Sequence, residues 1–170
     1  GIREAQLYLT YNDYSIGISN ANLWWGPGLH TSLSMTNNTT GFPHLMFGTL
    51  REKRTRNFGY NFRYIFSELK KMINKPYFTA IAFRFTFYTD PIITFGFSQN
   101  ILTQKTKNNK KNITKLDAAT IFFRKNDFLD NYYQTFSSYF IIDFPESNLK
   151  VFFELGSTDR WENFNDFLNY

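Results

Sequence analysis

The sequence contains no cysteine, so neither a disulfide bond nor a thiolate-bound metal can hold the fold together. It also lacks any apolar run of the roughly 18 residues that a membrane-spanning helix needs. The two histidines, His30 and His44, stand far apart in the chain and form no metal-ligand motif. These absences argue against zinc-ribbon domains, thiol-dependent enzymes and helical membrane anchors, and the sequence predicts neither a metal site nor a cofactor.

Aromatic residues are abundant instead. They make up 21% of the 170 residues, yet the mean hydropathy is slightly negative. The reason is a strict alternation. Over residues 57–67 every even position is aromatic, while the odd positions are mostly small or polar, and over residues 79–88 the apolar positions are the odd ones. A period of two predicts β-strands with one apolar and one polar face.

Short turn sequences separate the alternating stretches. Residues 12–13, 89–91 and 145–148 have the composition of tight turns, and each is expected to close an antiparallel hairpin. We expect about ten strands of roughly eight to twelve residues, joined alternately by tight turns and longer polar links. Both a soluble β-sandwich and a transmembrane β-barrel fit this pattern. The tyrosines and phenylalanines near strand ends and the unequal links favour the barrel.

Residues 24–43 contain two clusters of strand-breaking residues, one at Gly26, Pro27 and Gly28 and one over residues 37–43. This segment is similar to the most characteristic motif of the capsule-assembly Wzi family, in which Trp-Trp-Gly-Pro precedes a Ser-Leu pair, an Asn-Asn pair and a proline. The matching residues are Trp24, Trp25, Gly26, Pro27, Ser32, Leu33, Asn37, Asn38 and Pro43. The chain therefore resembles the Wzi family of outer-membrane β-barrels.

The resemblance implies an antiparallel barrel of about eighteen strands in the outer membrane of a Gram-negative bacterium. Its lumen is expected to be obstructed, and its function to be lectin-like binding of capsular polysaccharide without catalysis. Because about ten strands form only part of such a barrel, residues 1–170 are expected to be a single, incomplete barrel domain. The expected partners are the lipid bilayer, lipopolysaccharide, surface polysaccharide and other outer-membrane proteins. The alternative function is that of a structural accessory subunit of a larger secretion or nutrient-uptake complex.

Six residues are candidates for binding polysaccharide or for plugging the lumen. They are Trp24, Trp25, Asn37, Asn38, Arg63 and Arg84. Indole rings can stack on sugar rings or fill a constriction, and residues 24–43 are expected to turn into the lumen. Parity places Arg63 and Arg84 on the polar face, where they could line a path for acidic polysaccharide or pair with Glu154 or Asp143.

Two other groups of residues do not predict a functional site. His30, Ser32 and Asn37 are the residue types of a hydrolase triad, but positions two apart on a strand leave the side chains too distant for reliable hydrogen bonding. The sequence therefore predicts no catalytic site. The lysine-rich residues 105–115 are expected to form a solvated loop or to contact lipopolysaccharide. Since no recognition motif accompanies these lysines, nucleic acid is not an expected partner.

Overall fold

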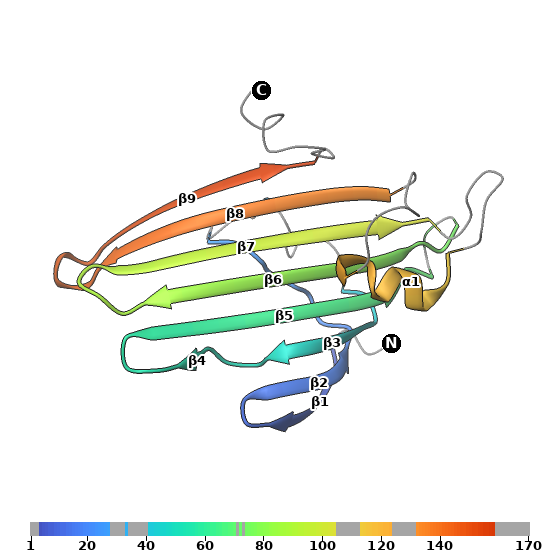
Figure 1. Cartoon of the computed structure of the whole chain (residues 1–170), viewed down its shortest axis with the longest axis horizontal. Helices are drawn as coiled ribbons and strands as arrows, with labels where there is room; N and C mark the ends of the chain where they lie inside the picture. The colour runs from blue at the N-terminus through green and yellow to red at the C-terminus, as the bar shows by residue number, and fades with distance from the viewer. Residues whose placement is uncertain are drawn as a thin grey trace.

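The computed structural model describes residues 4–27, 33, 41–70, 72, 74–104, 113–123 and 132–158, which form one antiparallel sheet (Figure 1). Its nine strands are β1 (Gln6–Tyr11), β2 (Tyr14–Ser19), β3 (His44–Thr49), β4 (Lys53–Arg54), β5 (Phe58–Glu68), β6 (Tyr77–Phe87), β7 (Ile92–Thr103), β8 (Tyr132–Phe144) and β9 (Leu149–Ser157). The order is β1-β2-β3-β5-β6-β7-β8-β9, with β4 paired to β5. The predicted antiparallel β architecture is confirmed, with nine described strands instead of about ten.

One face of the sheet, here called the aromatic face, carries a row of rings that crosses five strands. Residues in register share a face, and the row runs through Tyr60, Phe85, Phe95, Phe140 and Phe153. The ring centroids of Phe95 and Phe140 are 4.7 Å apart. The aromatic face is well exposed in the described part of the chain, where all strands belong to a single sheet, and Phe153 is 59% exposed. The described residues therefore do not pack as a two-sheet sandwich.

The opposite face, here called the polar face, carries small and polar side chains. Its corresponding row runs through Asn61, Arg84, Gly96, Tyr139 and Glu154. The assignment of apolar and polar positions from parity is thus confirmed for β5 and β6. Backbone pleating alone accounts for it, because successive side chains of a strand point to opposite sides.

The ends of the sheet differ. Antiparallel pairing of consecutive strands places the short turns at residues 12–13, 55–57, 88–91 and 145–148 together at one end, while the longer links 20–43, 69–76 and 104–131 start from the other end (Figure 1). The three predicted hairpins are confirmed by the pairing of β1 with β2, β6 with β7 and β8 with β9. The expected alternation of tight turns and long links is therefore present.

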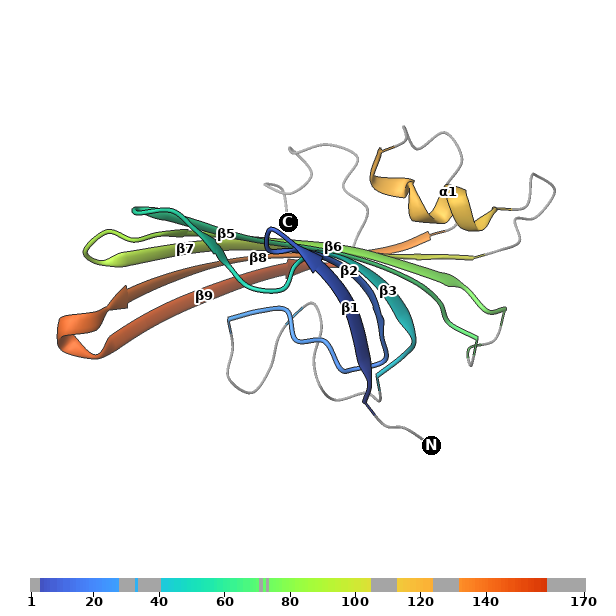
Figure 2. The ribbon, with the colours of Figure 1, turned by 90° about the horizontal axis from the view of Figure 1, so that it is seen from below.

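A short helix that the sequence analysis did not predict covers the long-link end of the aromatic face. It is α1 (Lys115–Ala119), followed by η1 (Ile121–Phe123), and it lies on the opposite side of the sheet from residues 20–27 (Figure 2). Thr114 caps α1 through a reciprocal capping box with Asp117, a spacing that could have signalled the helix. The hydroxyl of Thr79 donates to the Ala118 carbonyl at 2.9 Å. No helix among the described residues is long and apolar enough to cross a membrane.

The sheet is open in the described part of the chain. β1 and β9 form its two edges and do not pair with each other. The first and last described strands are therefore not neighbours. Each edge strand presents backbone N–H and C=O groups along one side. In an environment that excludes water, these groups need hydrogen-bond partners within the protein.

Candidate functional site

The described residues of the link between β2 and β3, namely 20–27, 33 and 41–43, include segments that lie over the polar face. Trp25 is 6% exposed and packs in a buried cluster with Ile65 of β5. Further along, the backbone N–H of Leu33 donates to Glu154 Oε1 at 3.2 Å, which brings the link to β9. The described parts of this link therefore reach from the middle of the sheet to its last strand. Asn37 and Asn38 lie outside the described residues.

A cavity of about 470 Å³ lies between the link and the polar face. Its polar and aromatic lining includes Trp24, Trp25, Arg51, Glu52, Asn61, Arg63, Arg84 and Tyr139. Four of the six candidate residues predicted from the sequence, Trp24, Trp25, Arg63 and Arg84, thus line one cavity. The two indoles differ in environment, because Trp24 is half-buried and Trp25 is buried.

Tyr139 is a cavity residue that the sequence analysis missed. Its ring lies against Gly96 on the neighbouring strand, so closely that a Cβ atom at position 96 would come within 2.0 Å of the ring carbon Cζ. A glycine inside a strand often marks such a close approach. Gly96 thus leaves room for the Tyr139 ring to lie over β7 beside the cavity. The glycine inside an otherwise alternating strand was the available sign in the sequence.

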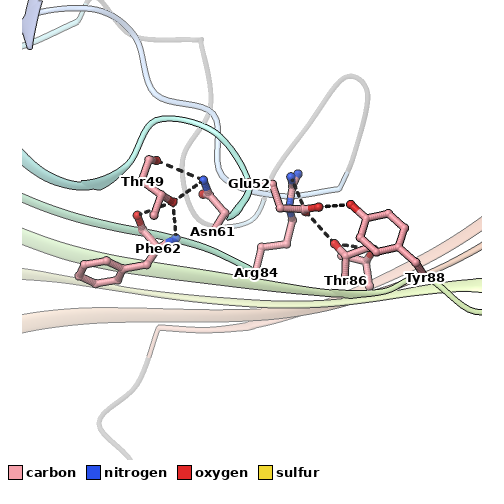
Figure 3. Close-up of polar contacts among 8 residues, drawn as sticks. Thr49, Glu52, Asn61, Phe62, Arg84, Thr86 and Tyr88 are labelled. Carbon is pink, nitrogen blue, oxygen red and sulfur yellow. Dashed lines mark hydrogen bonds and ion pairs between the residues drawn. The ribbon is translucent and has the colours of Figure 1, made fainter. Parts of the chain in front are cut away.

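Glu52 is the second residue that the sequence analysis missed, and it is the partner of Arg84 (Figure 3). Arg84 Nη2 donates to Glu52 Oε2 at 3.1 Å. Thr86 Oγ1 donates to the same oxygen at 2.8 Å, and the Tyr88 hydroxyl donates to Oε1. Both carboxylate oxygens of Glu52 are therefore engaged.

The predicted pairing of Arg84 with Glu154 or Asp143 is wrong. Asp143 pairs with Lys150 at 2.8 Å, and Glu154 accepts the N–H of Leu33. The reason lies in the chain between β3 and β4, which advances by five residues from Gly48 to Lys53 while β5 advances by three from Arg63 to Tyr60. The surplus residues leave the ladder, as in a bulge, and carry Glu52 over the polar face.

The hydrogen bonds around Glu52 shift the pKa values of two groups outside the strands. Burial disfavours the charged form of Glu52, but the bonds from Tyr88 and Thr86 and the positive charge of Arg84 outweigh it and hold the pKa of this carboxyl below its ordinary value. The pKa of Tyr88 is raised, mainly because its hydroxyl donates to Glu52. At neutral pH, Glu52 is therefore an anion and Tyr88 a neutral donor.

Arg63 is a cation of the cavity that forms no ion pair with a carboxylate in the described part of the chain. Its Nε is buried and has no hydrogen-bond partner among the described residues. The charged side chains that line the cavity are Arg51, Arg63, Arg84 and Glu52, so the positive charges outnumber the negative one. The site can accept an anion beside aromatic rings. In the described ranges, no group of three or more His, Asp or Glu side chains could hold a metal ion.

No protein-family model, curated protein or solved structure matches this chain. The resemblance to the Wzi family therefore stays a prediction that rests on the motif in residues 24–43.

Proposed function

We propose that this chain is part of an outer-membrane β-barrel of a Gram-negative bacterium that binds and organises surface polysaccharide without catalysing a reaction. The observation that carries the proposal is the contrast between the two faces, which continues across the strands from β5 to β9. An exposed aromatic surface of this extent is unfavourable in water and favourable in lipid. The polar face would then line the lumen.

The height of the aromatic face supports this orientation. On β5 the apolar positions run from Phe58 to Phe66, which is roughly 27 Å along an extended strand and about 20 Å along the membrane normal at the tilt of an outer-membrane barrel, with α1 covering the end near Tyr64. Tilted strands of outer-membrane barrels present an apolar band about 25 Å tall, bordered by aromatic residues. Tyr14 and Tyr60 meet with their hydroxyls 2.6 Å apart near the short-turn end, and the Lys53 ammonium lies 4.7 Å from the centre of the Tyr14 ring. Such amphipathic side chains suit a membrane–water boundary.

The open edges support a larger barrel. In lipid, every backbone polar group needs a hydrogen-bond partner inside the protein, and a sheet with two free edges does not meet that requirement. We therefore propose that additional strands join β1 to β9, so that this sheet forms one part of the barrel wall.

The polysaccharide would bind on the polar face, at the cavity beneath the β2–β3 link. Trp24 is half-buried and lines the cavity, so part of its indole is available for contact with a sugar ring. Trp25 is buried against Ile65 and anchors the link. The link itself would narrow the lumen. In this proposal, Trp24 contacts the ligand and Trp25 holds the obstruction in place.

Binding of the full-length protein to an array of bacterial surface glycans tests this function. Trp24→Ala should abolish or strongly weaken the glycan signal. Phe152→Ala is the matched control, because Phe152 is an aromatic side chain of β9 that is 49% exposed and does not line the cavity. A protein that binds no glycan but copurifies in fixed ratio with an envelope complex would favour the accessory-subunit function instead.

A further inference from the structure

The geometry points to a more specific ligand: the cavity binds the carboxylate of an acidic sugar, of the uronic acid class, through the guanidinium of Arg63. This inference rests on the proposed polysaccharide binding and names the chemical group that the site recognises.

The first argument is the charge of the cavity lining. Arg51, Arg63 and Arg84 line the cavity together with a single carboxylate, Glu52. Glu52 is already bound by Arg84, Thr86 and Tyr88. It therefore neutralises one guanidinium and leaves an excess of positive charge at a partly buried site.

Arg63 also has no acidic partner among the described residues. It lines the cavity, so a ligand can neutralise its charge. Two other acidic side chains of the polar face are engaged elsewhere, since Asp143 pairs with Lys150 and Glu154 accepts the Leu33 N–H. The planar fork of an arginine matches a carboxylate through two parallel N–H···O bonds. A carboxylate supplied by a ligand in the cavity would pair with the guanidinium of Arg63, which lines it.

The volume and the aromatic lining of the cavity favour a sugar acid over a small inorganic anion. The cavity volume of about 470 Å³ lies within the range of sites for small organic ligands. The half-buried Trp24 and the ring of Tyr139 line the same cavity as Arg63. Aromatic rings bind the apolar C–H face of a pyranose, while the arginine binds its carboxylate. An inorganic anion would use only the second contact.

The test compares two probes on the wild-type protein. The full-length protein in detergent is titrated with galacturonic acid oligosaccharides and with the same oligosaccharides after reduction of their carboxyl groups, and binding is followed by calorimetry. We expect the reduced oligosaccharides to bind roughly tenfold or more weakly. Inorganic phosphate, added as a competitor, should displace the acidic oligosaccharide only weakly.

Two variants locate the effect. Arg63→Gln should weaken binding of the acidic oligosaccharide to the level of the reduced one and leave binding of the reduced one unchanged. Lys150→Gln removes a cation from the same face outside the cavity lining, and it should change neither affinity. Urea unfolding of each variant verifies that it folds, and the probe comparison on the wild type needs no variant.

The outcomes separate the two proposals. Equal binding of both oligosaccharides would overturn the carboxylate inference and leave polysaccharide binding in place. Displacement by phosphate as effective as that by the acidic oligosaccharide would show a general anion site and would also overturn it. If neither oligosaccharide nor any glycan of the array binds, the proposed function itself is wrong, and the inference falls with it.

Discussion

Substitution of Phe95 by arginine distinguishes lipid from water at the aromatic face. Phe95 is the fourth residue of β7, toward its short-turn end, lies in register with Phe85 and Phe140, and is 46% exposed. Its ring is 4.7 Å from that of Phe140 and 6.3 Å from that of Phe87, measured between centroids. An arginine at position 95 would project outward from the aromatic face.

The expected cost follows from these contacts. Loss of the ring contacts should lower the free energy of unfolding by about 0.5–1.5 kcal/mol in either solvent. Phe95→Ala measures this part. If the aromatic face contacts lipid, the arginine adds roughly 1–4 kcal/mol, because a charged side chain costs about 2–4 kcal/mol at the bilayer midplane and less toward the interfaces. If the face contacts water, the arginine is solvated and adds less than about 0.5 kcal/mol.

The assay is the folding equilibrium of the full-length protein in phospholipid vesicles as a function of urea, followed by tryptophan fluorescence. Thr94→Arg is the control, because Thr94 precedes Phe95 on the same strand and lies on the polar face. It should change the free energy of unfolding by no more than about 1 kcal/mol. Equal stability of Phe95→Arg and Phe95→Ala would refute the lipid-facing orientation.

Three further substitutions test the site. Glu52→Gln should lower the free energy of unfolding by about 1 kcal/mol at neutral pH. The folded-state pKa of Glu52 is lowered, so its contribution to stability is present above the unfolded pKa and is lost as the pH falls through the folded pKa. Urea titrations should therefore show the variant and the wild type converging as the pH falls below the ordinary range of a glutamate pKa. Gly96→Ala should lower the free energy of unfolding by about 1–3 kcal/mol, because the new methyl group displaces the Tyr139 ring. The double variant with Tyr139→Ala should lose less stability than the sum of the two single variants. Losses that add in full would contradict the contact between the two residues. Trp25→Ala should lower the free energy of unfolding by about 3–5 kcal/mol and raise the conductance of protein-containing liposomes. If stability and conductance both stay unchanged, Trp25 does not hold the link.

The sequence by itself determined which side chains share a face. Phe62 and Phe83 lie together, opposite Arg63 and Arg84, because the pleat of a strand alternates side chains whatever the rest of the molecule does. Hairpins were equally predictable, since the turn at residues 89–91 needs only local chemistry. These features depend on neighbours in the chain and can therefore be inferred from a short stretch of it.

Only the tertiary structure decided which polar groups meet. Glu52 reaches Arg84 because surplus residues between β3 and β4 leave the ladder, and Trp25 becomes buried because the β2–β3 link passes over β5. The contact of α1 with Thr79 likewise joins segments that are distant in the sequence. Such contacts depend on strand register and on the path of long links, which are set by packing across the whole sheet. The alternating pattern predicts the polar face, but it does not specify which of its side chains become partners.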